Sequence, residues 1–291
     1  MPDFTIDTSH GLISVTDTAL KNDNPTILLL HGNSSSAKIF RHIFDSEDIT
    51  SAFRVVAFDY PGHGASSNAP EPDKSYSMSG YADLAVHVLQ HLNIAEVVVF
   101  GWSLGGHVGI ELIPLLQAAS IQLRGLMITG TPPALGLEQT NAGFLFEDGH
   151  LSTSAKLEWS EEDVDNFAKT SAAAGKPELC EDWMIDNARR TDGRARMMMW
   201  KKFANVDGKG NGQGADQRKV VEETDVLIAV VNGAEEQFVN LDYLDAIKWR
   251  NLWKGKCERL EGLKHAPFWE EPQLFNGLLY EFATDVSGHK E

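Results

Sequence analysis

The stretch that decides the fold is Val97-Val98-Val99-Phe100-Gly101-Trp102-Ser103-Leu104-Gly105-Gly106. Its apolar, β-branched beginning predicts a buried strand, and Val108, Ile110 and Leu112 after it predict the start of a buried helix. Between the two lies Gly-x-Ser-x-Gly, which in this setting is typical of a sharp turn that exposes a nucleophilic serine. The glycines leave room for the turn and for close packing of the strand against the helix. We therefore expect Ser103 to present its hydroxyl at the end of a strand.

Length and composition restrict the class of protein. The chain has 291 residues, of which 42% are hydrophobic, and this suits one α/β domain with an insertion or two small domains. The formal net charge is −17. Because there is no basic stripe, we expect neither nucleic acid nor an anionic membrane surface as a partner. The charge also weakly favours a substrate without a carboxylate or phosphate, although an acidic surface kept for solubility explains it equally well.

The cysteines and the N-terminus indicate the compartment. Cys180 and Cys257 provide no disulfide framework. The N-terminus has no basic region followed by an apolar run, so no secretory signal is expected. No apolar stretch approaches the roughly 18 residues that would suggest a membrane span. A reducing compartment, and hence a cytoplasmic location, is the expectation.

Strand and helix patterns alternate along most of the chain. After a hairpin over residues 3–17, an amphipathic helix is predicted at 79–92, with Ser77 or Ser79 as its cap. Alternation of this kind predicts a mostly parallel sheet flanked by helices. The strands expected after the hairpin lie at residues 27–30, 54–58, 97–100, 126–128, 226–231 and 256–260, and a C-terminal helix is expected at 270–284.

Residues 135–215 interrupt the alternation. Helices are predicted from Ser160 onward, at roughly 177–190 and at 193–204, with no strand between them. An all-helical insertion after a sheet strand indicates a cap over the carboxyl edge of the sheet, where open α/β sheets bind ligands. The predicted organisation is a helical cap at 135–215 and a core domain formed by residues 1–134 and 216–291.

Aromatic and methionine side chains of this insertion are expected to line an adaptable apolar pocket under the cap. Phe167, Met198 and Trp200 are the residues chosen for substrate contact. Ordinary packing within the cap explains each of them about as well. From the core, Gly32, Trp102 and Phe268 are expected to contact the substrate.

The loop His31-Gly32-Asn33-Ser34-Ser35-Ser36 follows the strand at 27–30. A polar, glycine-containing loop after a central strand leaves backbone N–H groups free to point at a ligand, and in a serine hydrolase one such donor completes the oxyanion hole. We expect the N–H of Asn33 to be that donor and the N–H of Leu104, after the nucleophile, to be its partner. The alternative is a turn that merely caps the following helix.

A serine hydroxyl needs an adjacent base, and the base needs a third group to hold its tautomer. Ser103, Glu236 and His265 follow one another in the order Ser, acid, His, which is the order of α/β-hydrolases. Glu236 lies three residues past a glycine at a strand end, and Glu235 is the fallback. His63 is interpreted as a structural loop histidine. No metal or cofactor is expected, since the cysteines lie far apart in sequence.

These motifs resemble those of the α/β-hydrolase superfamily and, more specifically, those of the metal-independent N-acyl-homoserine lactonases of that fold. The Gly-x-Ser-x-Gly motif is unspecific, because many hydrolases share it, whereas the runs at 124–133 and 190–196 lie outside it and are much more specific. The matching stretches are His31–Ser36, Pro61-Gly62-His63-Gly64, Ser75-Tyr76-Ser77-Met78, Gly80-Tyr81-Ala82-Asp83, Val99–His107, Arg124–Pro133, Arg190–Arg196, Ala229–Gly233 and His265-Ala266-Pro267-Phe268.

The resemblance implies an α/β-hydrolase fold, with a mostly parallel eight-stranded sheet flanked by helices and a helical cap insertion. It also implies opening of the lactone ring of N-acyl-homoserine lactones, known as quorum quenching, through an acyl-enzyme intermediate. Carried over by position, Ser103 is the nucleophile, His265 the base and Glu236 the acid, with Asn33 and Leu104 as the oxyanion hole. Lys264 and Gln237 depart from the usual residues beside the base and the acid.

Other functions remain open from the sequence. A broader esterase that accepts a lactone or another ester is the nearest alternative. A hydrolase-fold ligand receptor, or a cofactor-free dioxygenase that uses a histidine and an acid, is also considered. The expected partner is a small lactone or ester substrate, and no sequence feature requires a partner protein.

Overall fold

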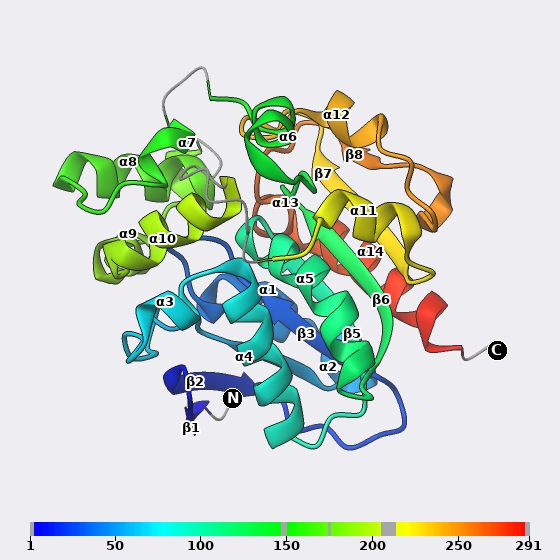
Figure 1. Ribbon diagram of the computed structural model, residues 1–291. Coiled ribbons are helices and arrows are strands. Elements are labelled where there is room, and N and C mark those ends of the chain that lie inside the picture. Colours follow the sequence, from blue (N-terminus) through cyan, green and yellow to red (C-terminus); the bar gives the residue numbers. More distant parts are fainter. Residues whose placement is uncertain (1–2, 147–149, 174–175, 205–213, 289–291) are drawn as a thin grey trace.

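The computed structural model describes residues 3–146, 150–173, 176–204 and 214–288. Within them, eight strands form one sheet in the order β1-β2-β4-β3-β5-β6-β7-β8 (Figure 1). β1 and β2 form the antiparallel opening hairpin, β2 pairs antiparallel with β4, and every pair from β4 to β8 is parallel. The strands are β1 (Asp3–Thr8), β2 (Gly11–Asp17), β3 (Thr26–Leu30), β4 (Val55–Phe58), β5 (Glu96–Trp102), β6 (Gln122–Thr129), β7 (Leu227–Gly233) and β8 (Glu258–Leu260). The expected eight-stranded, mostly parallel sheet is confirmed.

The central strands β3, β4, β5 and β7 are buried almost throughout, because successive strand residues point to opposite faces and each face is covered by helices. In β5, Val97 and Val99 pack toward one face, whereas Val98 and Phe100 pack toward the other. The helices on the first face are α4 (Met78–His91), α5 (Leu104–Ala118) and α11 (Gln217–Glu223). Those on the second are α1 (Arg41–Phe44), α2 (Glu47–Ala52), α13 (Pro267–Glu270) and α14 (Pro272–Ser287).

Two helix boundaries have clear local causes. Ser77 caps α4, because its hydroxyl accepts the N–H of Gly80 at 3.0 Å. The C-terminal helix predicted at 270–284 is instead divided into α13 and α14. Glu271, at the division, has φ −135° and ψ 71°, because the proline after it disfavours helical backbone.

Among the residues that the structure describes, five α-helices lie between β6 and α11 and gather largely at one end of the sheet (Figure 1). Side chains bond them to loops that follow the parallel strands. Asn187 Nδ2 donates to Ser36 Oγ at 2.7 Å, and the Tyr76 hydroxyl donates to Asp192 Oδ2 at 2.7 Å. The helices are α6 (Gly136–Gly143), α7 (His150–Thr153), α8 (Glu161–Ser171), α9 (Asp182–Arg190) and α10 (Gly193–Ala204). The helix predicted at 177–190 is in fact a 3₁₀ turn, Pro177–Leu179, followed by α9.

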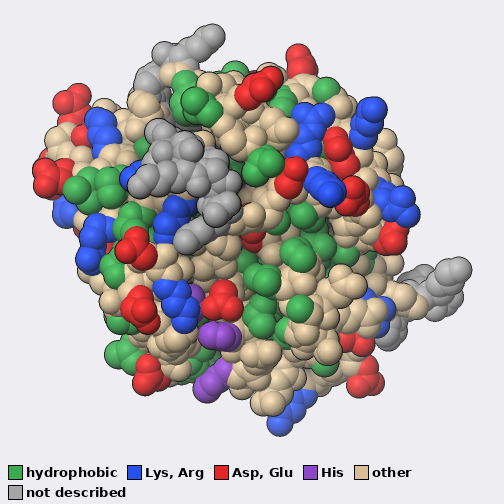
Figure 2. Space-filling view, viewed as in Figure 1, with side chains coloured by type: hydrophobic (Ala, Val, Ile, Leu, Met, Phe, Trp, Pro, Cys, Tyr) green, Lys and Arg blue, Asp and Glu red, His purple; other side chains and the backbone are tan. Residues whose placement is uncertain are grey.

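The surface is acidic but mixed. On the face shown in Figure 2, acidic and basic side chains are interspersed, and several ion pairs join them, such as Arg259 with Asp242 and Asp245. None of the helices described combines the length and the apolar character that crossing a membrane requires.

Candidate active site

Ser103 lies at the turn between β5 and α5. Its backbone has φ 55° and ψ −117°, a conformation that is strained for a residue with a side chain. The Ser103 N–H donates to Thr129 O at 2.7 Å, and the Ser103 carbonyl accepts Thr131 Oγ1 at 2.9 Å. A Cβ on Gly105 would overlap the carbonyl oxygen of Leu30. Glycine there therefore allows the N-terminus of α5 to lie directly against the end of β3.

Glu236 and His265 form a buried pair. His265 Nδ1 donates to Glu236 Oε2 at 2.8 Å, and Glu236 Oε1 accepts the N–H of Phe238 at 2.8 Å. The Glu236 side chain is 0% exposed. Because a carboxylate only accepts, Nδ1 carries the hydrogen and Nε2 keeps its lone pair. The fallback residue, Glu235, is exposed, so the geometry favours Glu236.

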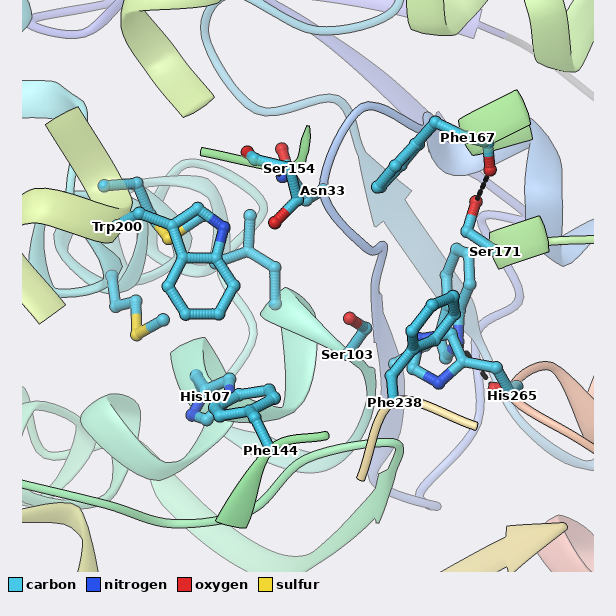
Figure 3. A pocket seen from close by; sticks show the side chains of 14 residues that line it. Asn33, Ser103, His107, Phe144, Ser154, Phe167, Ser171, Trp200, Phe238 and His265 are labelled. Atoms are coloured by element: carbon cyan, nitrogen blue, oxygen red, sulfur yellow. Dashed lines mark hydrogen bonds between the residues drawn. The ribbon is translucent and has the colours of Figure 1, made fainter. Parts of the chain in front are cut away.

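Ser103 and His265 line the same cavity (Figure 3). Within the described part of the chain, no direct hydrogen bond joins the Ser103 hydroxyl to the His265 ring. Such contacts are often long before a substrate is bound. His265 is nevertheless bonded to strand β5, which leads into Ser103, because Trp102 Nε1 donates to the His265 carbonyl at 2.9 Å.

Gly130, at the end of β6, lies against the His265 ring. Its φ is +64°, and a Cβ there would lie 2.5 Å from His265 Cε1. We expect Gly130→Ala to push the ring away from Ser103 and to lower kcat about 10²-fold, the size of effect that a displacement of about 1 Å can produce. Steady-state kinetics with the substrate proposed below measure this.

Gly136→Ala is the matched control. Gly136 also has a positive φ, +70°, but nothing lies within 4 Å of its Cβ position. It carries the same type of backbone strain without touching the ring. Equal kcat values for the two variants, at similar thermal midpoints, would contradict the positioning role of Gly130.

Two backbone donors lie close to the nucleophile turn. Among the described residues, neither the N–H of Asn33 nor that of Leu104 donates to an acceptor. Hydrogen bonds of the buried His31 ring hold the loop that carries Asn33 in place. His31 Nδ1 donates to Gly32 O at 2.8 Å, and its Nε2 accepts the N–H of Tyr60 at 3.1 Å. Two free N–H groups on rigid backbone are what an oxyanion hole requires.

Burial lowers the pKa of His31 to about 4. The unfolded chain takes up a proton near pH 6.5, so between pH 6.5 and 4 it binds more protons than the folded chain does. The stabilising contribution of neutral His31 is therefore complete above pH 6.5 and is lost as the pH falls. We expect about 2 kcal/mol to be lost between pH 6.5 and 5.

Urea unfolding of the natural chain and of His31→Gln at the two pH values measures this contribution as a difference. The stability gap between the two proteins should narrow by about 2 kcal/mol at pH 5. An NMR titration of the His31 ring with a midpoint near pH 6.5 would contradict the expectation.

The space beside Ser103 that side chains leave free is about 560 Å³, a volume that includes space open to solvent. Three of the predicted contact residues, Trp102, Phe167 and Trp200, line it. The full lining is Asn33, Met78, Trp102, Ser103, Leu104, His107, Phe144, Ser154, Phe167, Ser171, Met199, Trp200, Phe238 and His265.

Gly32, Met198 and Phe268 do not line this cavity, which corrects the expectation for them. Phe268 is 1% exposed and packs in the core against the Trp102 ring at 5.3 Å. The Cβ position of Gly32 faces the Trp102 ring at 2.8 Å, so Gly32 lies against that ring and outside the lining. Of the three consecutive methionines on α10, Met199 lines the cavity.

Sequence reasoning missed His107, Phe144 and Phe238. The spacing contained a signal for His107, because it lies four residues after Ser103 and therefore one helical turn away on α5. Phe238 follows Glu236 by two residues, and its ring meets the His265 ring at 4.8 Å. Phe144 comes from a segment with no motif.

Apart from His107 and His265, no histidine whose side chain the structure describes lines this cavity. The His63 ring is fully buried, with Nδ1 3.3 Å from Pro61 O, which agrees with its interpretation as structural.

Sequence reasoning also missed a metal-ligand spacing, since His87 and His91 lie four residues apart on α4. His10, Asp83 and His87 do bring three possible ligand atoms within 4.8 Å of one another. However, both His10 nitrogens already bond, to Ser75 and Asp83.

The fold and this site define the class of protein. The chain belongs to the alpha/beta hydrolase family, whose model matches residues 27–278. The crystal structure of the N-acyl homoserine lactonase AidH in complex with N-butanoyl homoserine is 42% identical in sequence, with a TM-score of 0.89, over 100% of this chain and 99% of that one. The resemblance to these lactonases is thereby confirmed.

Two curated proteins match at lower identity or over a smaller part of the chain. The pimeloyl-[acyl-carrier protein] methyl ester esterase of Aromatoleum aromaticum is 23% identical over 86% of this chain and 95% of its own length. The magnesium-chelatase 30 kDa subunit of Rhodobacter capsulatus is 32% identical over 90 residues, which is 31% of this chain and 30% of that protein.

Proposed function

We propose that this chain is a serine hydrolase that opens the lactone ring of N-acyl homoserine lactones. The observation that carries the proposal is the buried Glu236–His265 pair beside Ser103, in an apolar cavity with two free N–H donors. The 42% identity to the lactonase AidH over the whole chain supports the substrate class.

In the proposed reaction, Ser103 Oγ attacks the lactone carbonyl carbon while His265 Nε2 accepts the hydroxyl proton. Negative charge develops on the carbonyl oxygen, and the N–H groups of Asn33 and Leu104 stabilise it. The tetrahedral intermediate collapses, the ring C–O bond breaks, and His265 returns the proton to the departing oxygen. Because that oxygen stays attached to the acyl part, the first product is a ring-opened ester on Ser103.

The second half repeats these steps with water. His265 takes a proton from water, the resulting hydroxide attacks the ester carbonyl, and Ser103 leaves with the proton from His265. The product is an N-acyl homoserine. No step requires a metal ion or cofactor.

In this proposal, residues 135–215 act as a helical cap over a core of residues 1–134 and 216–291.

The test is ring opening by the purified protein, followed by chromatography and mass spectrometry of N-butanoyl and N-hexanoyl homoserine lactone. The expected result is steady turnover that a chelator does not change. Loss of turnover in the chelator, or a single slow event in place of steady turnover, would contradict the proposal.

Open-chain methyl esters form the comparison that separates a lactonase from a broader esterase. The pimeloyl methyl ester esterase relative gives a specific reason to include them. A kcat/KM for the methyl esters above that for the lactones would assign the chain to the broader class.

A further inference from the structure

Two buried polar atoms that border the active-site cavity have no hydrogen-bond partner among the described residues. They are Nε2 of His107 and Nε1 of Trp200, and both residues line the cavity with Ser103. Figure 3 shows both side chains on the side of Ser103 opposite His265. They are neighbours as well, since each ring contacts Phe144 and Phe203. Buried polar atoms are nearly always paired, so two unpaired ones in one cavity require a reason.

A chain of hydrogen bonds fixes which His107 nitrogen carries the hydrogen. Glu111 accepts the N–H of Ala215 at 2.8 Å and Nε2 of Gln217 at 3.1 Å. Because the Gln217 amide group donates to Glu111, its Oε1 faces His107 Nδ1, at 2.7 Å. An amide oxygen only accepts, so Nδ1 must carry the hydrogen and Nε2 must be an acceptor. Burial lowers the pKa of His107 to about 4, which keeps the ring neutral.

The Trp200 indole N–H is a donor only. An otherwise largely apolar wall therefore offers one acceptor, on His107, and one donor, on Trp200. The chemical group that matches this pair is a secondary amide, which has one N–H and one carbonyl oxygen. Neither atom carries charge, which excludes a carboxylate or an ammonium as the better match.

We propose that His107 Nε2 accepts the N–H, and Trp200 Nε1 donates to the carbonyl oxygen, of an amide in the substrate. This inference rests on the proposed function, because it assumes that the reacting carbonyl lies at Ser103. In an N-acyl homoserine lactone the amide nitrogen is bonded to the carbon next to the reacting carbonyl. His107 lies one helical turn from Ser103 on α5, so its acceptor is near the position that this nitrogen takes.

The proposal makes the amide a specificity determinant. A site built to hydrogen-bond a substrate group rejects an analogue that lacks the group, because its own buried polar atoms are then left unpaired. We expect kcat/KM for N-hexanoyl homoserine lactone to exceed that for the α-alkyl γ-butyrolactone of equal chain length about 10²-fold. The ester analogue, with oxygen in place of the amide N–H, should also be poor, since its oxygen faces the His107 lone pair.

Two variants separate the two contacts. Trp200→Phe keeps an aromatic ring and removes the donor, so the preference for the amide over the alkyl lactone should fall about tenfold. His107→Phe removes the acceptor, so the preference for the amide over the ester analogue should disappear. Trp183→Phe is the matched control, because Trp183 Nε1 donates to Glu181 at 2.7 Å and Trp183 does not line the cavity. Its preferences should equal those of the natural chain.

The outcomes distinguish the two proposals. If the natural chain hydrolyses none of the three lactones, the proposed function fails. If it hydrolyses the amide and alkyl lactones with equal kcat/KM, the amide contacts are refuted while the lactonase proposal survives. If Trp200→Phe lowered kcat/KM by the same factor for all three lactones, the amide contacts would also be refuted. Trp200→Phe keeps this test decisive even if His107→Phe, which leaves Gln217 Oε1 without its donor, fails to fold.

Discussion

Replacing Ser103 by alanine is expected to lower kcat for N-hexanoyl homoserine lactone about 10⁶-fold, the effect that loss of the nucleophile has in a known serine hydrolase. In the proposed reaction the Ser103 hydroxyl oxygen forms the covalent bond to the substrate, and alanine has no group that can replace it. Some catalysis over water should remain, because binding and the two N–H donors are untouched. Product analysis at high enzyme concentration measures the residual rate.

The fold should survive this change. The backbone bonds of Ser103, to Thr129 and from Thr131, do not involve its hydroxyl. The thermal midpoint of Ser103→Ala is therefore the control. Intact-protein mass spectrometry during turnover adds an independent readout, since the natural chain should carry the acyl adduct and the variant should not. Activity within tenfold of the natural chain would refute the role of Ser103.

Replacing Glu236 by glutamine is expected to lower kcat about 10⁴-fold, the cost of trapping the catalytic histidine in the wrong tautomer. Glu236 Oε1 accepts the Phe238 N–H, whereas Oε2 accepts His265 Nδ1–H. In the variant, the amide oxygen should remain on the Phe238 N–H, so the amide NH₂ faces Nδ1. Nδ1 must then accept, and the hydrogen moves to Nε2, the atom that has to take the Ser103 proton.

Glu235→Gln is the matched control for this prediction. It makes the same chemical change one residue earlier, on an exposed side chain. Its kcat should stay within about twofold of the natural value, because surface substitutions away from functional features have small effects. The opposite result, with activity lost in Glu235→Gln and kept in Glu236→Gln, would reassign the acid.

The parts of the structure that local chemistry determines could be predicted from the sequence. The β-branched run before Ser103, the glycines around it and the capping serine at 77 each act within a few residues, so strand, turn and helix start followed from them. Likewise, Glu236 and His265 follow strands, and the carboxyl ends of parallel strands meet at one edge of the sheet. The structure brings these two together as expected.

The residues that line the cavity could not be predicted from the sequence, because they depend on how helices that are distant in sequence pack together. In the run Met197–Trp200 every residue suits an apolar pocket, yet only the orientation of α10 selects Met199 and excludes Met198. Phe268 lies only three residues after His265 but packs into the core. The unpaired nitrogens of His107 and Trp200 become visible only when partners more than a hundred residues apart, such as Gln217, are placed.

The backbone at Ser103 has a consequence for how this lineage can evolve. Its φ of 55° with ψ −117° suits glycine far better than serine. Mutation to glycine would relieve the backbone strain of the turn, and under the proposed function it would also end hydrolysis. We therefore expect serine to persist at position 103 only while selection for turnover outweighs the relief of strain that glycine would bring. A descendant that has given up chemistry should therefore drift to glycine here first, and the residue at this position records whether the ancestral activity is still under selection.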